Sequence, residues 1–261
     1  MNKQIIIKLA ISFWVLFIGI DAFSQTRLIK EVTCDDSDLP DSLVLDDLFK
    51  SAYNESKLNL DRYISEIVRV DSHLFHEIEM HTEIKPEFYI ALSCFPEIEN
   101  KQFDFRYKRI KGTMNARPDV LNLFRNRANR KYLILINNNK GHHKGVPPDE
   151  LSRGAMLGWY GHELAHLQTF QMMSNLQIIL FILRYVTSVV YVKKVERFTD
   201  YIAIERGLVF PIYESGQYLA TYGNVTNSYK KMNVFNSLSL DEYKCLWYKL
   251  RDKTLLKSGY R

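Results

Sequence analysis

The sequence contains only three cysteines, Cys34, Cys94 and Cys245, among 261 residues. Their spacings match no metal-binding pattern, so a metal site built from cysteines is excluded. The odd number allows one disulfide with one free thiol in an exported protein, but the sequence does not choose the pair. Three buried free thiols are equally acceptable.

The sequence also lacks a strong excess of one charge and any internal repeat. Its net charge is +5, with 25% charged and 46% hydrophobic residues, which is ordinary for a globular protein. Basic residues form only short groups, at residues 106–111 and 125–131, and no nucleic-acid-binding motif accompanies them. We interpret these groups as solvated faces and expect no nucleic-acid partner.

No apolar run reaches the length of about 20 residues that a membrane-spanning helix needs. The first apolar run, residues 9–20, is flanked by lysines before it and small residues after it. This order predicts a secretory signal peptide over residues 1–24, with an uncleaved N-terminal anchor as the alternative. Export to the periplasm or envelope is therefore expected, with a polar linker at residues 25–41 and one domain over residues 42–261.

The centre of the sequence carries His162, Glu163 and His166 in the order His-Glu-x-x-His. On a helix of roughly 3.6 residues per turn, the two histidines share one face, so both imidazoles can bind one zinc ion. Glu163 lies about 100° around the helix, where it can address a water on the metal without being a ligand. The motif predicts His162 and His166 as ligands and Glu163 as the general base.

A second motif follows on a later predicted helix. A catalytic zinc usually has three protein ligands and one open position, and Glu196 can be the third ligand. Asp200 lies four residues further on, on the same helical face, and can accept the second N–H of a ligating histidine. Glu196 could instead be a solvated glutamate paired with a neighbouring cation.

With both motifs present, the chain resembles the gluzincin zinc metallopeptidases, whose pattern is His-Glu-x-x-His followed by Glu-x-x-x-Asp. It is most similar to the membrane-associated prenyl-protein protease and heat-shock protease type, in which an apolar stretch separates the motifs. Thr199 stands where alanine is common in that type. The resemblance covers about residues 100–210 and implies one zinc per chain, with His162, His166 and Glu196 as its ligands.

The resemblance also implies a polypeptide substrate and further site residues. The strand before the active-site helix often pairs with an extended peptide in this family, which suggests that role for the residues of the run 133–137. They are Leu133, Ile134, Leu135, Ile136 and Asn137. A donor for the tetrahedral oxyanion is also needed, and the candidates are Tyr201, Arg206, Tyr213 and Tyr222.

Residues 176–192 form the second apolar run, interrupted only by Arg184. A single helix of this length spans roughly 25 Å, slightly less than a bilayer core. Because the chain must leave His166 and return with Glu196, we expect an out-and-back insertion that turns near residues 187–188. Its partner is predicted to be a membrane or a hydrophobic protein, with burial or a dip into the bilayer as alternatives.

The remaining pattern predicts an α+β protein, mostly helical and zincin-like, with a small sheet before the active-site helix. Helices are expected at residues 42–69, 120–128, 148–172, 196–209, 216–232 and 240–256, and strands at 87–94, 103–108 and 132–136. Three glycines of the active-site helix predict close packing against another backbone. His73 and His76 could chelate an ion at i, i+3, but His81 lies five residues beyond His76 on a diverging face, and we interpret this segment as a solvent-exposed helix end. His142 and His143 could form a second metal site or contact substrate, and we interpret them as part of a polar loop.

The predicted function is a zinc-dependent metalloendopeptidase for exported or envelope proteins. One alternative is an inactive, chaperone-like envelope protein that binds zinc structurally, and the presence of Glu163 argues against it. The other is a membrane-surface assembly protein organised by residues 176–192, in which the histidine motif is coincidental.

Overall fold

The computed structural model describes Ile29, Val32 and residues 39–70, 86–119, 127–138, 145–222 and 225–251, with side chains in α2 described as far as residue 62. The expected signal peptide, the histidines outside the central motif and most of the expected helix 120–128 lie outside these residues. The described part is mostly helical with one small sheet, which agrees with the predicted α+β class.

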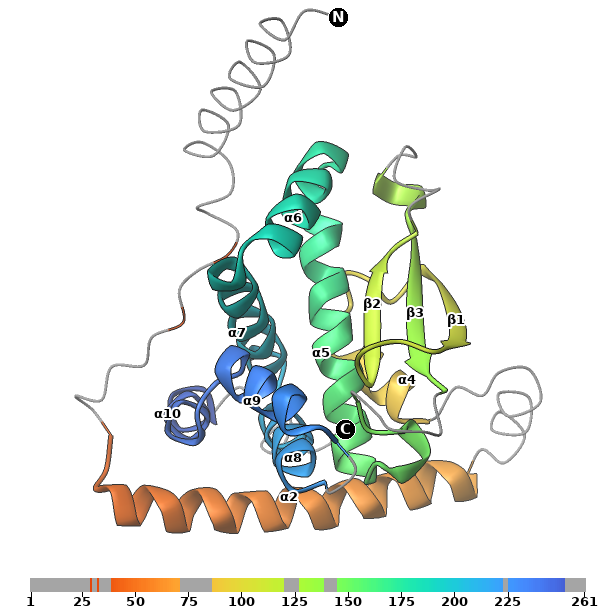
Figure 1. Ribbon diagram of the computed structural model, residues 1–261. Helices are drawn as coiled ribbons and strands as arrows, with labels where there is room; N and C mark the ends of the chain where they lie inside the picture. Colours follow the sequence, from red (N-terminus) through yellow and green to blue (C-terminus); the bar gives the residue numbers. More distant parts are fainter. Residues whose placement is uncertain are drawn as a thin grey trace, which may run out of the picture.

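Helix α5 (Arg153–Met172) lies between the sheet on one side and most of the other helices on the opposite side (Figure 1). The predicted start at residue 148 is wrong, because the chain there forms the short 3₁₀ helix η3 (Pro148–Glu150). Ser152 then caps α5, because its side-chain oxygen accepts a hydrogen bond of 3.2 Å from the amide of Ala155. The predicted end of the helix is confirmed.

The C-terminal end of α5 is held by the buried side chain of Arg130. Its guanidinium donates hydrogen bonds to the carbonyl oxygens of Phe170 at 2.5 Å and Met173 at 3.2 Å, and to the side chain of Asn175 at 2.8 Å. A cation beside the last carbonyl groups of a helix also complements the helix dipole. Arg130 therefore ties α5 to the sheet at the end distant from Ser152.

The sheet has three strands, β1 (Gln102–Lys108), β2 (Met114–Pro118) and β3 (Lys131–Asn137). Strand β3 is in the middle, parallel to β1 and antiparallel to β2. The prediction that residues 133–137 form an edge strand for substrate is therefore wrong, because β3 pairs with strands on both sides. Among the described strands, β2 is the edge strand beside α5 (Figure 1).

The predicted strand at residues 87–94 is also wrong, because this segment is helix α4 (Pro86–Ser93). Phe88, Ile90 and Leu92 suggested the alternation of a strand, but Glu87 before them and Ala91 between Ile90 and Leu92 are buried as well. A short helix that is buried on most sides carries no clear period. The ring of Phe88 packs edge-on against aromatic side chains of β1 and α5, namely Phe103, Phe105 and Tyr160.

The apolar insertion is two helices, α6 (Asn175–Thr187) and α7 (Val189–Glu205). They meet at Ser188, which ends α6 and caps α7, and their axes are bent by 118°. The predicted turn near residues 187–188 is confirmed. Within the described residues, no single helix has the length and composition of a membrane span, and only this bent pair passes that test when its two helices are taken together.

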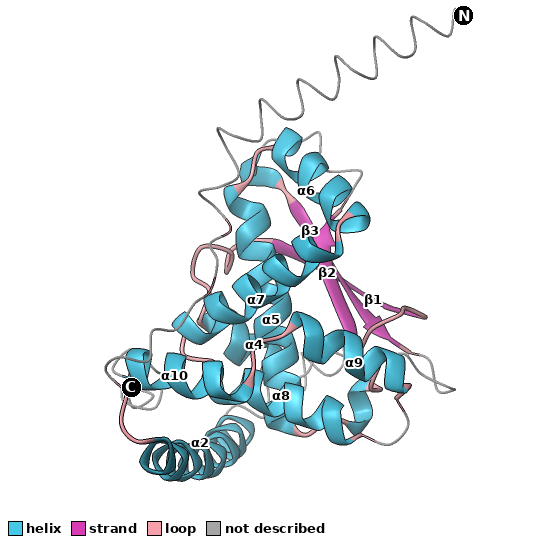
Figure 2. Cartoon of the chain, turned by 60° about the vertical axis from the view of Figure 1, so that its left-hand side comes forward, coloured by secondary structure: helices cyan, strands magenta, loops and turns pink. Residues whose placement is uncertain are grey.

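Three helices follow α7 along the described chain: α8 (Val209–Thr221), α9 (Asn227–Asn236) and α10 (Leu240–Leu250). The single helix expected over residues 216–232 is thus divided, since α8 ends before Tyr222 and Thr226 caps α9. Figure 2 shows α8 and α9 on the same side of α5 as α7.

Helix α2 (Ser42–Val70) lies along one end of the molecule (Figure 1). Phe49 anchors it among the aromatic rings of Phe210, Tyr213 and Trp247, with ring centres 5.1–5.5 Å apart. Two residues of the expected linker also pack against the domain, because Ile29 is buried and the carbonyl oxygen of Val32 accepts a hydrogen bond from Arg197. Cys245 is disulfide-bonded and Cys94 is a free thiol.

The glycines of α5 permit close packing of α8 and the turn before it. A side-chain carbon at Gly158 would lie 2.0 Å from the carbonyl oxygen of Pro211. At Gly154 and Gly161 it would meet the side chains of Glu214 and Leu208 instead. The expectation of packing against another backbone is therefore confirmed at Gly158.

We predict that Gly158→Ala destabilises the fold by about 1–3 kcal/mol, because the backbone of α8 must move away from α5. The matched control is Gly216→Ala in α8, where nothing lies within 4 Å of the added carbon. That change should stabilise the protein by about 0.5–1 kcal/mol, because alanine loses less backbone freedom in a helix. Chemical denaturation of both variants measures the difference, and equal effects would contradict the packing described.

Candidate metal centre

The packing of α5 against α7 brings the two sequence motifs together. His162 and His166 project from α5 with ring centres 4.8 Å apart. Glu196 comes from α7, and its Oε2 lies 3.1 Å from His162 Nε2 while its Oε1 lies 3.6 Å from His166 Nε2. One ligand atom from each residue lies within 4.8 Å of the other two, so the three side chains form a group that can hold a metal ion.

The other nitrogen of each imidazole has its own partner. His162 Nδ1 lies 2.8 Å from Asp200 Oδ1, and His166 Nδ1 lies 3.1 Å from the hydroxyl oxygen of Thr199. Such contacts fix the orientation of a ligating histidine and direct its Nε2 toward the metal. Asp200 therefore has the contact predicted for it, whereas no motif indicated a contact for Thr199.

The electrostatics of the group reflect its burial and its close opposite charges. Burial favours neutral His162, but the hydrogen bonds and charges of Asp200 and Glu196 outweigh it and raise the pKa of His162 well above its ordinary value. Burial likewise disfavours charged Glu196, but the two histidines hold the pKa of its carboxyl well below its usual range. The group thus stabilises an anionic Glu196, the form that ligates a metal.

Glu163 is buried beside this group and makes a different contact. Its Oε2 accepts a hydrogen bond of 2.5 Å from the amide of Ala116 in the edge strand β2. Burial raises the pKa of the Glu163 carboxyl, although the charges of His166 and His162 oppose the shift. The contact with Ala116 orients the carboxylate at the wall of the site formed by β2.

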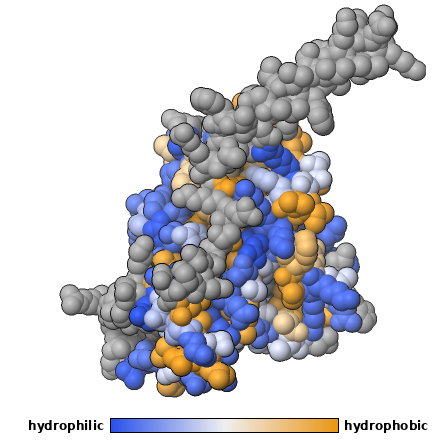
Figure 3. Space-filling model, turned by 90° about the vertical axis from the view of Figure 1, so that its left-hand side faces the viewer, coloured by the Kyte–Doolittle hydropathy of each residue, from blue (hydrophilic) through white to orange (hydrophobic). Residues whose placement is uncertain are grey.

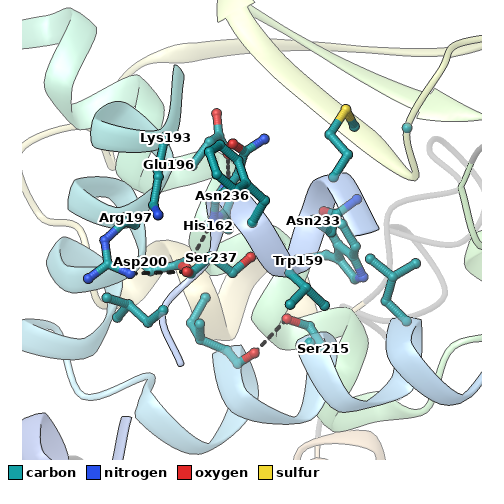
Figure 4. A pocket seen from close by; sticks show the side chains of 18 of the residues that line it. Trp159, His162, Lys193, Glu196, Arg197, Asp200, Ser215, Asn233, Asn236 and Ser237 are labelled. Atoms are coloured by element: carbon teal, nitrogen blue, oxygen red, sulfur yellow. Dashed lines mark hydrogen bonds and ion pairs between the residues drawn. The ribbon is translucent and has the colours of Figure 1, made fainter. Parts of the chain in front are cut away.

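A cleft of about 1360 Å³ opens over the group, between β2 and the helices α6 to α9. His162, Glu196 and Asp200 lie together at one side of it, and Trp159 and Asn233 lie at the other (Figure 4). Met114 and Asn115 of β2 also line it. The candidate centre is therefore at the wall of an open cleft, which molecules can reach from solvent.

Three of the four proposed oxyanion donors do not line this cleft. The hydroxyl of Tyr201 donates to Glu205, Arg206 is paired with Glu97, and Tyr222 donates to Glu150. Tyr213 does line the cleft, but its ring packs edge-on against Phe49.

The structure adds three tyrosines that the sequence motifs did not reveal. The hydroxyl of Tyr185 in α6 donates to Glu196 Oε1 at 2.5 Å, and that of Tyr243 in α10 donates to Asp200 Oδ2 at 3.3 Å. Tyr229 of α9 lines the cleft, and its burial and the nearby charges of Glu163 and Glu196 raise its pKa to about 12. No spacing rule marks these residues, because each comes from a different helix.

Comparison of the chain with protein-family models, with characterised proteins and with solved structures found no match.

We predict that Tyr185→Phe lowers the affinity of the site for a divalent metal ion by about tenfold or more, because Glu196 loses the donor that orients it. Competition with a chromogenic chelator measures this affinity. Tyr191→Phe is the matched control, since Tyr191 packs against the same ring of Phe181 but is not among the partners of Glu196. Equal affinities of the two variants would show that Tyr185 does not orient the ligand.

Proposed function

We propose that the protein is a zinc-dependent metalloendopeptidase with a zincin-like fold. One observation carries the proposal: the Nε2 atoms of His162 and His166 converge on the carboxylate of Glu196, beside a buried carboxylate, Glu163, that lies outside this group. Two imidazoles and one carboxylate form a donor set typical of catalytic zinc, which keeps a further position open. A purely structural zinc site is usually closed by four protein ligands.

When bound, zinc lowers the pKa of its water from about 15.7 toward 7. With zinc held by His162, His166 and Glu196, Glu163 would act as the general base, accepting a proton from the attacking water and donating it to the leaving amine. Burial raises the pKa of the Glu163 carboxyl from its ordinary value, a shift in the direction that favours a group that both accepts and donates a proton. The hydrogen bond from Ala116 holds the carboxylate in place.

Tyr229 is the hydroxyl group best suited to stabilise the oxyanion. It lines the cleft close enough to feel the charges of Glu163 and Glu196, and its pKa of about 12 keeps it protonated at neutral pH. A protonated hydroxyl can donate a hydrogen bond to the charge that develops on the carbonyl oxygen. Tyr185 is less suited, because it already donates to Glu196.

The proposed substrate is an extended polypeptide that pairs with β2. Strand β2 is an edge of the sheet within the described chain, and Met114 and Asn115 line the cleft. Pairing with an edge strand uses main-chain hydrogen bonds and makes little demand on the side chains of the peptide. We therefore assign the pairing with substrate to β2 in place of residues 133–137.

We further propose that the protein is exported and acts in the periplasm or envelope. The order of residues in the segment 1–24 supports this location. A disulfide at Cys245 also supports it, because disulfides persist mainly in oxidising compartments. The proposed substrates are therefore exported or envelope proteins.

We predict about one zinc ion per chain, lost in His166→Ala because only two of the three ligands remain. Elemental analysis of the purified wild-type and variant proteins measures the metal. A zinc-free wild-type protein, or full retention of zinc in His166→Ala, would refute the site and favour the alternative of a membrane-surface assembly protein.

We predict that Glu163→Gln keeps the zinc but lowers peptide hydrolysis by about 10²–10⁴-fold, because the amide cannot accept the proton of the water. Hydrolysis of an unfolded envelope protein measures the activity, and elemental analysis of the same preparation is the control for the metal. If neither protein hydrolyses the substrate although both hold zinc, the alternative of an inactive, chaperone-like zinc protein is favoured. An unchanged rate would place the chemistry on other residues.

A further inference from the structure

We propose that α6, the start of α7 and α9 form a docking surface for an anionic lipid bilayer, with the mouth of the cleft at the lipid surface. The proposal goes beyond peptide hydrolysis and does not depend on it. It rests on exposed apolar side chains, on the charges beside them and on the bend between α6 and α7.

Helix α6 exposes apolar side chains along much of its length, although it also contributes to the core. Its inner face is formed by Ile178, Leu180 and Phe181, which are buried. The outer apolar residues of α6 and the first residues of α7 are each at least 40% exposed: Leu176, Ile179, Ile182, Leu183, Val186, Val189 and Val190. Figure 3 shows hydrophobic side chains reaching the surface on this side of the molecule. Exposed apolar area of this extent is typical of an interaction surface.

Helix α9 continues the apolar surface on the other side of the cleft. Met232, Val234 and Phe235 are at least 50% exposed, and all three line the cleft, as does Val186 of α6. The two parts meet where the ammonium of Lys193 in α7 lies 4.4 Å from the ring centre of Phe235. The exposed apolar residues of both helices thus border one opening.

The charged residues of these segments are all basic. Arg184, Lys193 and Lys194 are the only charged residues between positions 175 and 195, and Lys230 and Lys231 are the only ones in α9. Apolar side chains accompanied by lysine and arginine alone complement a bilayer with anionic headgroups. A second copy of the same surface is a poor partner, because a symmetric dimer would bring these cations face to face.

The geometry favours a position in the interface over a span. α6 and α7 are bent by 118° at Ser188, and neither helix alone is long and apolar enough to cross a bilayer. Amphipathic helices with a basic rim lie in the plane of the interface and bury only their apolar face. A single membrane-binding element usually gives only reversible attachment, and stable attachment usually needs a second one. The N-terminal apolar segment would be this second element if it remained uncleaved. This surface would present the cleft to polypeptide segments close to the membrane.

The test uses the full chain and vesicles of phosphatidylcholine with phosphatidylglycerol, in which the acyl chains are brominated to quench tryptophan emission on contact. Tryptophan is introduced singly as Val190→Trp or Val234→Trp. The matched control is Leu43→Trp in α2, because Leu43 is 75% exposed, close to the 78% of Val190 and the 70% of Val234. Emission of the parent chain is subtracted from each variant.

The added tryptophan at positions 190 and 234 should shift to shorter wavelength and lose intensity with the anionic vesicles, and less so with phosphatidylcholine alone. The tryptophan at position 43 should change little. The proposal is overturned if the chain floats with the vesicles while positions 190 and 234 stay unquenched, since the N-terminal segment would then account for all binding. It is also overturned if position 43 is quenched equally, or if the shift occurs without lipid as the protein concentration rises, which indicates self-association. None of these outcomes depends on zinc content or hydrolysis, so the proposed function is tested separately.

Discussion

The contact between α5 and α7 is the constraint on which the candidate centre depends. His162 contacts Asp200 through one ring nitrogen and Glu196 through the other, so one histidine links both acidic residues of α7. Asp200 is buried here, and the side chains of His162 and Glu196 are only 15% and 17% exposed, so the loss of water around each one alone would be costly. The close opposite charges offset that cost, which means that the two motifs stabilise each other even before a metal binds. Removal of either acidic residue would leave one ring nitrogen of His162 without its partner.

The packing of α5 explains how the candidate ligands can be held in fixed positions although the cleft beside them is open to solvent. Ser152 and Arg130 fix the two ends of the helix, while Gly158 lets the backbone of α8 approach it. The face of α5 with His162 and His166 is therefore placed by contacts that lie away from the cleft. Ligand positions held by rigid elements suit catalysis better than positions held by flexible loops.

Helix α6 contributes both to the candidate metal centre and to the proposed docking surface. Tyr185 reaches inward to Glu196, and Val186, the next residue, is exposed at the mouth of the cleft. A helix that moved on contact with lipid would therefore move a ligand's hydrogen-bond donor as well. The edge strand β2 likewise contributes to both the centre and the cleft. The amide of Ala116 donates to Glu163, while Met114 and Asn115 line the cleft. A peptide that paired with β2 would lie directly beside Glu163, the proposed general base.

The sequence by itself determined the parts of the site that depend on local geometry. Residues four apart on a helix share a face whatever surrounds them, so the spacing alone pairs His162 with His166 and Glu196 with Asp200. The turn near Ser188 followed from the need to return to the same ion. The order of the strands, the helical state of residues 86–93 and the division between α8 and α9 could not be derived this way. They depend on which elements cover which, and a short segment buried on most sides loses the period that would identify it. For the same reason only the tertiary structure excluded Tyr201, Arg206 and Tyr222 from the cleft and brought Tyr185 and Tyr229 to it. Their positions result from the packing of separate helices, which no spacing within one segment records.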